Sequence, residues 1–141
     1  MLVAGGVRDP GSGPSLLASA ELYDPSTGAF TATGDMMIAQ ECQGATLLTS
    51  GKVLIAGGTA PDAELYDPAT TGTFSPTGKY SSWPDDDTGP CQALSTLLPE
   101  GRVLIVWEGP ALGAPTGGGA AAELYDPDSG TFTATGTTIA L

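Results

Sequence analysis

The hexapeptide AELYDP occurs three times in this sequence, at residues 20–25, 63–68 and 122–127. It is either a chemical site present in three copies or part of one structural unit that the chain repeats. Other landmarks recur with it, since LVAGG, LIAGG and LIVWE begin at Leu2, Leu54 and Leu104, at spacings of 52 and 50 residues. A period of about 50 residues is typical of kelch-type propeller repeats. The spacing therefore favours a repeated structural unit.

Short apolar runs separated by turn residues fill each period, and no long segment has helical spacing. The sequence has 21 glycines and 12 prolines, which fits many short strands joined by turns. In the second period we predict strands over residues 44–49, 52–56, 63–66 and 72–75, the last one ending at Pro76. β-Branched and aromatic residues fill these runs. Four short antiparallel strands in each period predict one propeller blade.

The order of these landmarks resembles the bacterial kelch repeat, in which LL-x-x-G-K/R-V-L-I is followed by a glycine pair, AELYDP and a late aromatic residue. The resemblance covers essentially the whole chain and implies a kelch β-propeller, the fold of the propeller domain in galactose-oxidase-like proteins. Two features depart from the repeat. Trp107-Glu108 replace the glycine pair of the third period, and Gln40 and Gln43 stand where the bacterial repeat usually has Arg and His.

We therefore expect an all-β fold, a kelch-type β-propeller fragment of about three four-stranded antiparallel blades. The blades would span residues 1–35, 36–79 and 80–141, and the first would lack its innermost strand. Propellers usually close with four to eight blades, so three are too few. We expect the chain to be a piece of a longer propeller. The alternatives are two or three copies that complete a ring, and an open array capped by a partner.

A structural role accounts for each part of AELYDP without any catalysis. We expect the tyrosine rings to pack between blades and the aspartates to accept hydrogen bonds from the amides of the following turn. Gly28, Gly72 and Gly130 would close the hairpins with positive φ, and Phe30, Phe74 and Phe132 would return on the fourth strand. The structural repeat residues are Gly5, Gly6, Gly57, Gly58, Tyr23, Asp24, Pro25, Tyr66, Asp67, Pro68, Tyr125, Asp126 and Pro127.

The composition excludes several classes of function. With 16 acidic and 4 basic residues the chain lacks the clustered cations that nucleic acid binding needs, and no apolar run is long enough for membrane insertion. It has no histidine, which excludes triads, Cys–His dyads and imidazole metal ligands, including those of the copper site that the resemblance would imply. We expect a non-enzymatic module that binds protein or carbohydrate. The alternatives are the non-catalytic part of a galactose-oxidase-like copper oxidase and a structural spacer.

Long connections between the strands differ from period to period, and by alternation they share one face of the propeller. They span residues 7–18, 36–43, 79–92 and 109–119. Variable loops on a rigid scaffold often carry binding residues, so we expect the binding surface on this face. Its candidate residues are Tyr80, Trp83, Asp85, Asp86, Asp87 and Trp107.

The three aspartates and Trp107 have a simpler interpretation. The three adjacent carboxylates Asp85, Asp86 and Asp87 could hold Ca²⁺, but they lack the alternating spacing of an EF-hand loop, which favours a solvated acidic loop without a cofactor. Trp107 stands where other repeats have glycine, which favours repacking inside the third blade.

We expect Cys42 and Cys91 to be free thiols, because adjacent blades fan apart there. The compartment stays open, and the resemblance leans towards a secreted or envelope protein of a bacterium.

Overall fold

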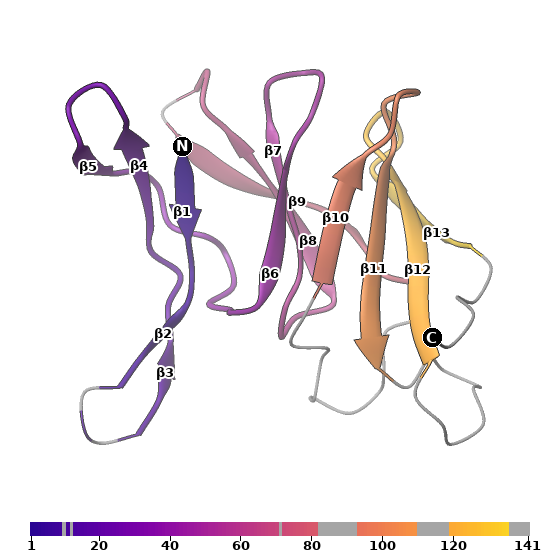
Figure 1. Cartoon of the computed structure of the whole chain (residues 1–141), viewed down its shortest axis with the longest axis horizontal. Coiled ribbons are helices and arrows are strands. Elements are labelled where there is room, and N and C mark those ends of the chain that lie inside the picture. Colours follow the sequence, from indigo (N-terminus) through magenta and orange to yellow (C-terminus); the bar gives the residue numbers. More distant parts are fainter. Residues whose placement is uncertain (10, 12, 71, 82–92, 110–118, 136–141) are drawn as a thin grey trace.

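The computed structural model describes residues 1–9, 11, 13–70, 72–81, 93–109 and 119–135. Thirteen β-strands and no helix make up this part of the chain. The strands form three antiparallel sheets and one small hairpin. Figure 1 shows the three sheets side by side in chain order, from the indigo N-terminal sheet through the magenta one to the orange and yellow one.

Sheet one has the strand order β1 (Leu2–Ala4), β4 (Ala20–Asp24) and β5 (Ala29–Ala32). Sheet two contains β6 (Gln43–Leu47), β7 (Val53–Gly57), β8 (Asp62–Asp67) and β9 (Thr73–Lys79), in that order. Sheet three contains β10 (Ala93–Leu97), β11 (Val103–Gly109), β12 (Gly119–Asp126) and β13 (Thr131–Ala134). The expected all-β fold, with three antiparallel sheets of which the first has one strand fewer, is confirmed.

The strands differ from the sequence prediction at several places. The segment 7–18, expected to be a loop, forms a hairpin of β2 (Val7–Arg8) and β3 (Ser15–Leu16). The fourth strand of sheet two does not end at Pro76 but continues to Lys79, with a register shift opposite Asp62 and Glu64. Proline has no N–H to donate, and it is tolerated here because β9 is the edge strand of its sheet.

The glycine pair limits the length of the strand that it ends, which is β7 in sheet two. Gly57 and Gly58 have φ of 87° and 85°, and β7 ends there. A side chain at Gly57 would collide with Ala93 of the next sheet, so glycine is also needed for close packing. In sheet three Trp107 and Glu108 replace the pair, and β11 continues to Gly109 while its partner β12 begins at Gly119. The interval 109–119, expected to be a long loop, is therefore partly strand.

Each AELYDP strand ends at its aspartate, and the proline that follows begins the turn. As expected, Oδ1 of each aspartate accepts a hydrogen bond from a turn amide, that of Ser26, Ala69 or Asp128, at 2.9 Å in all three copies. The hairpin glycines Gly28, Gly72 and Gly130 have φ of 71°, 68° and 67°. The predicted turn chemistry is confirmed in every repeat.

A repeated cross-strand pattern gives each sheet two different faces. In each sheet the AELYDP strand lies between two partners. One partner (β1, β7 or β11) places an aliphatic residue opposite the glutamate of AELYDP, and the other (β5, β9 or β13) places a phenylalanine opposite its tyrosine. We call this the Glu–Tyr face. Its members are Val3, Glu21, Tyr23 and Phe30 in sheet one, Ile55, Glu64, Tyr66 and Phe74 in sheet two, and Ile105, Glu123, Tyr125 and Phe132 in sheet three.

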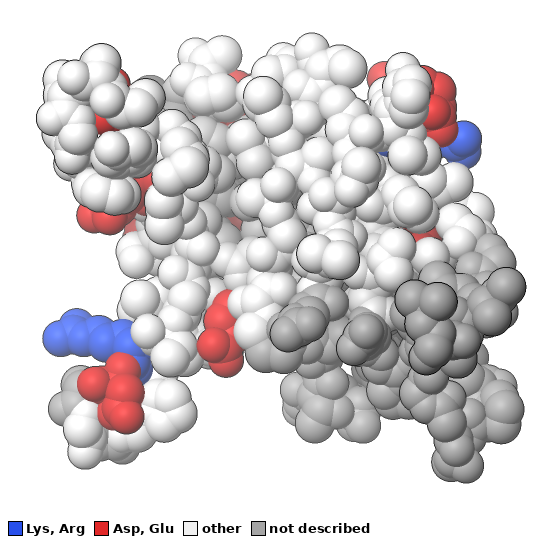
Figure 2. Space-filling model, in the orientation of Figure 1, with Lys and Arg blue, Asp and Glu red and all other residues white. Residues whose placement is uncertain are grey.

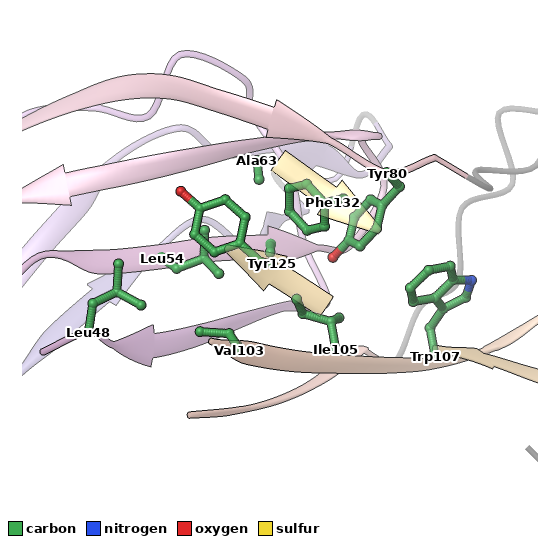
Figure 3. Close-up of a cluster of buried hydrophobic side chains, with 10 residues drawn as sticks. Leu48, Leu54, Ala63, Tyr80, Val103, Ile105, Trp107, Tyr125 and Phe132 are labelled. Carbon is green, nitrogen blue, oxygen red and sulfur yellow. The ribbon is translucent and has the colours of Figure 1, made fainter. Parts of the chain in front are cut away.

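The opposite face of each sheet carries the leucine of AELYDP and the alternate residues of the second strand, and we call it the leucine face. It comprises Leu2, Ala4 and Leu22 in sheet one, Leu54, Ala56 and Leu65 in sheet two, and Leu104, Val106 and Leu124 in sheet three. The main core lies where the leucine face of sheet two meets the Glu–Tyr face of sheet three. Figure 3 shows Leu54 from the first of these faces near Tyr125, Val103 and Ile105 from the second.

Candidate functional site

The connections between strands separate into two groups, as the sequence predicted. Figure 1 shows the turns β4–β5, β6–β7, β10–β11 and β12–β13 on one side of the molecule. The β2–β3 hairpin and the ends of β11 and β12 at Gly109 and Gly119 lie on the opposite side. We call the second side the long-connection side. Its described hairpin exposes Val7 and Leu16 to solvent.

Two of the predicted binding residues are not on the surface. Tyr80 and Trp107 are buried, and the ring of Tyr80 lies 4.8 Å from that of Trp107 and 4.7 Å from that of Phe132. Figure 3 shows Tyr80 between these two neighbours. Burial, with a smaller contribution from Glu123, raises the pKa of the Tyr80 hydroxyl far above its ordinary value. The expectation that these two aromatics form a binding surface is wrong, because both complete the core between sheets two and three.

The other predicted binding residues, Trp83, Asp85, Asp86 and Asp87, lie outside the described residues, as does Cys91. Within the described part of the chain, no group of three His, Cys, Asp or Glu side chains could hold a metal ion. The solvated acidic loop without a cofactor stays a prediction, and Ca²⁺ at the three aspartates stays its alternative.

Cys42 corrects another expectation, because it is disulfide-bonded and not a free thiol. The chain has one other cysteine, Cys91. The two precede the first strands of sheets two and three. The divergence of adjacent sheets therefore does not prevent Cys42 from forming a disulfide.

The glutamates of AELYDP have a role that the sequence reasoning missed. Glu64 is buried on β8, and its Oε2 and Oε1 accept hydrogen bonds from the backbone amides of Met37 and Ile38 at 2.8 and 3.0 Å. Those amides belong to the connection that enters sheet two. Glu123 is likewise buried, and its Oε2 accepts a hydrogen bond from the amide of Ser81 at 3.0 Å. Each carboxylate thus holds the segment that joins its sheet to the preceding one.

A sequence signal for this role was available. The glutamate recurs in an inward position of an apolar strand, opposite Ile55 in sheet two and Ile105 in sheet three. A charged residue repeated at a core position indicates a specific buried partner, because an unpaired buried charge is strongly destabilising. The partner itself, a pair of backbone amides, has no side-chain signature.

The tyrosines also join neighbouring sheets, as predicted. The hydroxyl of Tyr66 is hydrogen-bonded to that of Thr33, which follows sheet one, at 2.9 Å. The hydroxyl of Tyr125 is hydrogen-bonded to that of Thr77 in sheet two at 2.7 Å. Burial raises the pKa of Tyr125, although its bond to Thr77 opposes the shift. The same hydrogen bond between a tyrosine and a threonine hydroxyl therefore occurs at both interfaces between sheets.

Gln43 and Gln40, which depart from the bacterial repeat, lie where sheets one and two meet. Nε2 of Gln43 donates a hydrogen bond to the carbonyl of Ala4 on β1 at 2.7 Å. Gln40 is fully buried, and its backbone carbonyl accepts a hydrogen bond from the amide of Gly6 at 2.9 Å. Among the described residues neither amide atom of its side chain has a hydrogen-bond partner. Both glutamines belong to the packing between sheets and not to an open surface.

A small groove lies on the side of the tight turns. It is lined by residues of three turns, Thr49, Glu100, Gly101, Arg102, Asp126, Pro127 and Asp128, and has a volume of about 300 Å³. Arg102 forms an ion pair with Glu100 at 3.2 Å within this lining, and both side chains are exposed. The groove is polar and open to solvent, and it does not coincide with the long-connection side.

The surface chemistry and the comparisons with known proteins leave the ligand class open. On the face seen in Figure 2 most of the surface is uncharged, and basic side chains appear only at two separate places near the ends of the molecule. Among the described residues no helix has the length and apolar character needed to cross a membrane. No known family model matches the chain, and no curated protein is similar to it in sequence.

Proposed function

We propose that the three sheets are consecutive blades of a kelch-type β-propeller that acts as a non-enzymatic binding module for protein or carbohydrate. The observation that carries this proposal is the separation of the connections. Uniform tight turns occupy one side, and connections that differ between the repeats occupy the other (Figure 1). A scaffold that repeats its packing but varies one edge is the usual arrangement of a binding protein.

The packing between sheets supports the propeller part of the proposal. The Glu–Tyr face of one sheet meets the preceding sheet through the same glutamate and tyrosine contacts twice, at Glu64 and Tyr66 and again at Glu123 and Tyr125. Sheets that each contact only their neighbours in one repeated manner are the basis of repeat architectures. A crystal structure in which the three sheets do not fan about a common axis would refute this part.

The disulfide at Cys42 agrees with action outside the cytoplasm. Disulfides persist in oxidising compartments such as the periplasm and the extracellular space, and are rare in cytosolic proteins.

Binding is tested with a panel of neutral oligosaccharides and of basic peptides, using calorimetry in Ca²⁺ and in EDTA. The long-connection variant combines Trp83→Ala with Asp85→Asn, Asp86→Asn and Asp87→Asn. The matched control combines Ser50→Ala with Asp128→Asn in the exposed tight turns. We expect a ligand whose binding is lost in the first variant and kept in the control. A ligand that only the control loses, or no binding at millimolar concentration across the panel, overturns the proposal.

A further inference from the structure

The two internal interfaces of this chain form a template for a third one. In both, the Glu–Tyr face of the later sheet is covered. Ile55, Glu64 and Tyr66 of sheet two are almost completely buried, and so are Ile105, Glu123 and Tyr125 of sheet three. Between sheets two and three the cover comes from the leucine face of sheet two. In both interfaces, the connection that follows the preceding sheet contributes the backbone amides that bond the glutamate.

Sheet one carries the same face without its cover. Val3 is 43% exposed and Phe30 57% exposed, and Glu21 is exposed as well. The arrangement of this face is nevertheless complete. Val3 lies opposite Glu21 and Tyr23 opposite Phe30, with the two rings 4.9 Å apart, as they are in sheet three. A mainly apolar face is therefore exposed to solvent, and it carries a glutamate whose counterparts in sheets two and three are buried.

The far end of the chain carries the complementary face. In sheet two, Leu54 and Ala56 of the leucine face are buried against sheet three. In sheet three the corresponding Leu104 and Val106 are only half-buried. On the neighbouring strand Leu94 is 75% exposed, where its counterpart Gly44 in sheet two packs closely on Ala93 and Ser95.

The residue that receives the tyrosine hydroxyl recurs at this end too. Thr33 and Thr77, each followed by a glycine, are the partners of Tyr66 and Tyr125. Thr135-Gly136 is the third copy of this pair in the sequence, and it follows β13 of sheet three. The Thr-Gly sequence that follows the fourth strand is thus repeated in all three sheets.

We propose that the Glu–Tyr face of sheet one binds the leucine face of sheet three in a second copy of this chain. The contact is head to tail, because the two faces are different surfaces of the molecule. It would place Val3 of one copy against Leu104 of the other, in the manner of the interface between sheets two and three. Contacts of this type build rings when the rotation closes and open filaments when it does not.

Charge predicts how this assembly responds to salt. Each copy has a formal charge of −12, so two copies repel one another at long range, whereas the two faces that meet are mainly apolar. Added salt screens the repulsion over distances beyond about 10 Å at 0.1 M and leaves the apolar contact intact. We expect the association to strengthen as sodium chloride increases.

Two surface variants and their mixture test the proposal by light scattering after size-exclusion chromatography. Glu21→Lys puts a cation on the face of sheet one, and Leu104→Lys puts one on the face of sheet three. Burying an unpaired charge is strongly unfavourable, so each variant should weaken association by about 100-fold. Ser50→Lys, in an exposed tight turn away from both faces, is the matched control. Circular dichroism and thermal unfolding check that all four proteins fold, and Leu94→Asp replaces Leu104→Lys if that variant does not.

The expected pattern is specific to head-to-tail contact. The natural chain and Ser50→Lys should show a mass that rises with concentration above that of one chain. Each face variant alone should be monomeric. A mixture of the two variants should give dimers and nothing larger, because one intact face remains on each partner. A monomeric natural chain, face variants that still associate alone, or a mixture that stays monomeric would each overturn the proposal.

Discussion

The hydroxyls of Tyr66 and Thr33 lie 2.9 Å apart and join sheet two to sheet one across 33 residues of sequence. Tyr125 and Thr77 make the same bond between sheets three and two, at 2.7 Å across 48 residues. The third AELYDP tyrosine, Tyr23, lies in sheet one, the first of the described sheets. One chemical contact is therefore repeated wherever two sheets meet.

Removal of the Tyr66 hydroxyl should weaken that junction. Tyr66→Phe keeps the ring against Phe74 but deletes the bond to Thr33, and we expect the free energy of unfolding to fall by about 1 kcal/mol. Urea unfolding measures the change. Tyr23→Phe is the matched control, and at concentrations at which the chain is monomeric it should leave the midpoint unchanged. Equal losses in the two variants would show that the bond between sheets contributes nothing.

Replacement of Glu64 by an uncharged residue should destabilise the fold. Its two carboxylate oxygens accept the amides of Met37 and Ile38, whereas a glutamine there offers one acceptor and turns an NH₂ group towards an N–H donor. We expect Glu64→Gln to lower the free energy of unfolding by about 1–3 kcal/mol, the cost of a buried group left unsatisfied. Glu21→Gln, at the exposed copy of the position, should be neutral at concentrations at which the chain is monomeric. Chemical denaturation of both variants is the measurement, and a neutral Glu64→Gln would contradict the assigned role.

The turn aspartates predict acid sensitivity. The bond from the amide of Ala69, followed by that from Lys52, holds the pKa of Asp67 below its ordinary value, and the bonds from Ser26 do the same for Asp24. A carboxyl whose pKa is lower in the folded state stabilises the fold above its unfolded pKa and loses that contribution as pH falls through the folded one. Stability should therefore decline below about pH 4.

The size of this acid effect is set by solvent, because both aspartates lie at the surface and the ion pair of Lys52 with Asp67, at 3.3 Å, is partly exposed. Asp67→Asn removes one titrating group, so its denaturation midpoint should fall less between pH 5 and pH 2 than that of the natural chain. Thermal unfolding across that range measures the difference. Identical pH profiles for the two proteins would exclude the shifted pKa of Asp67 as a cause.

Reduction should destabilise the chain. Cys42 is disulfide-bonded, and we infer Cys91 as its partner because the sequence has no other cysteine. A bond between these two positions would close a loop that includes all of sheet two. Cross-linking a loop of about 50 residues restricts the unfolded chain by about 4 kcal/mol. We expect dithiothreitol to lower the urea midpoint of the natural chain and to leave Cys42→Ser unchanged. A reductant effect of the same size in both proteins would refute the cross-link.

The repeat, the strand type and the turn chemistry were predictable because each depends on residues close together in sequence. Asp67 bonds the amide two residues on, Gly72 turns the chain locally, and the alternation through 63–66 predicts a strand from its own side chains. The β2–β3 hairpin and the extension of β9 through Pro76 were missed. Both depend on pairing with a neighbouring strand, which local propensity does not reveal.

The sequence by itself determined that this protein is built from three similar units of antiparallel strands, because periodicity and turn residues act within a few positions of one another. Only the tertiary structure decided what the repeated residues contact. Tyr80 looks like an exposed loop aromatic in the sequence but fills the core between two sheets, together with Trp107. Glu64 looks like a surface carboxylate but binds two amides that lie 26 and 27 residues away. Burial and long-range hydrogen bonds arise only when the sheets pack, and no single repeat contains its partner.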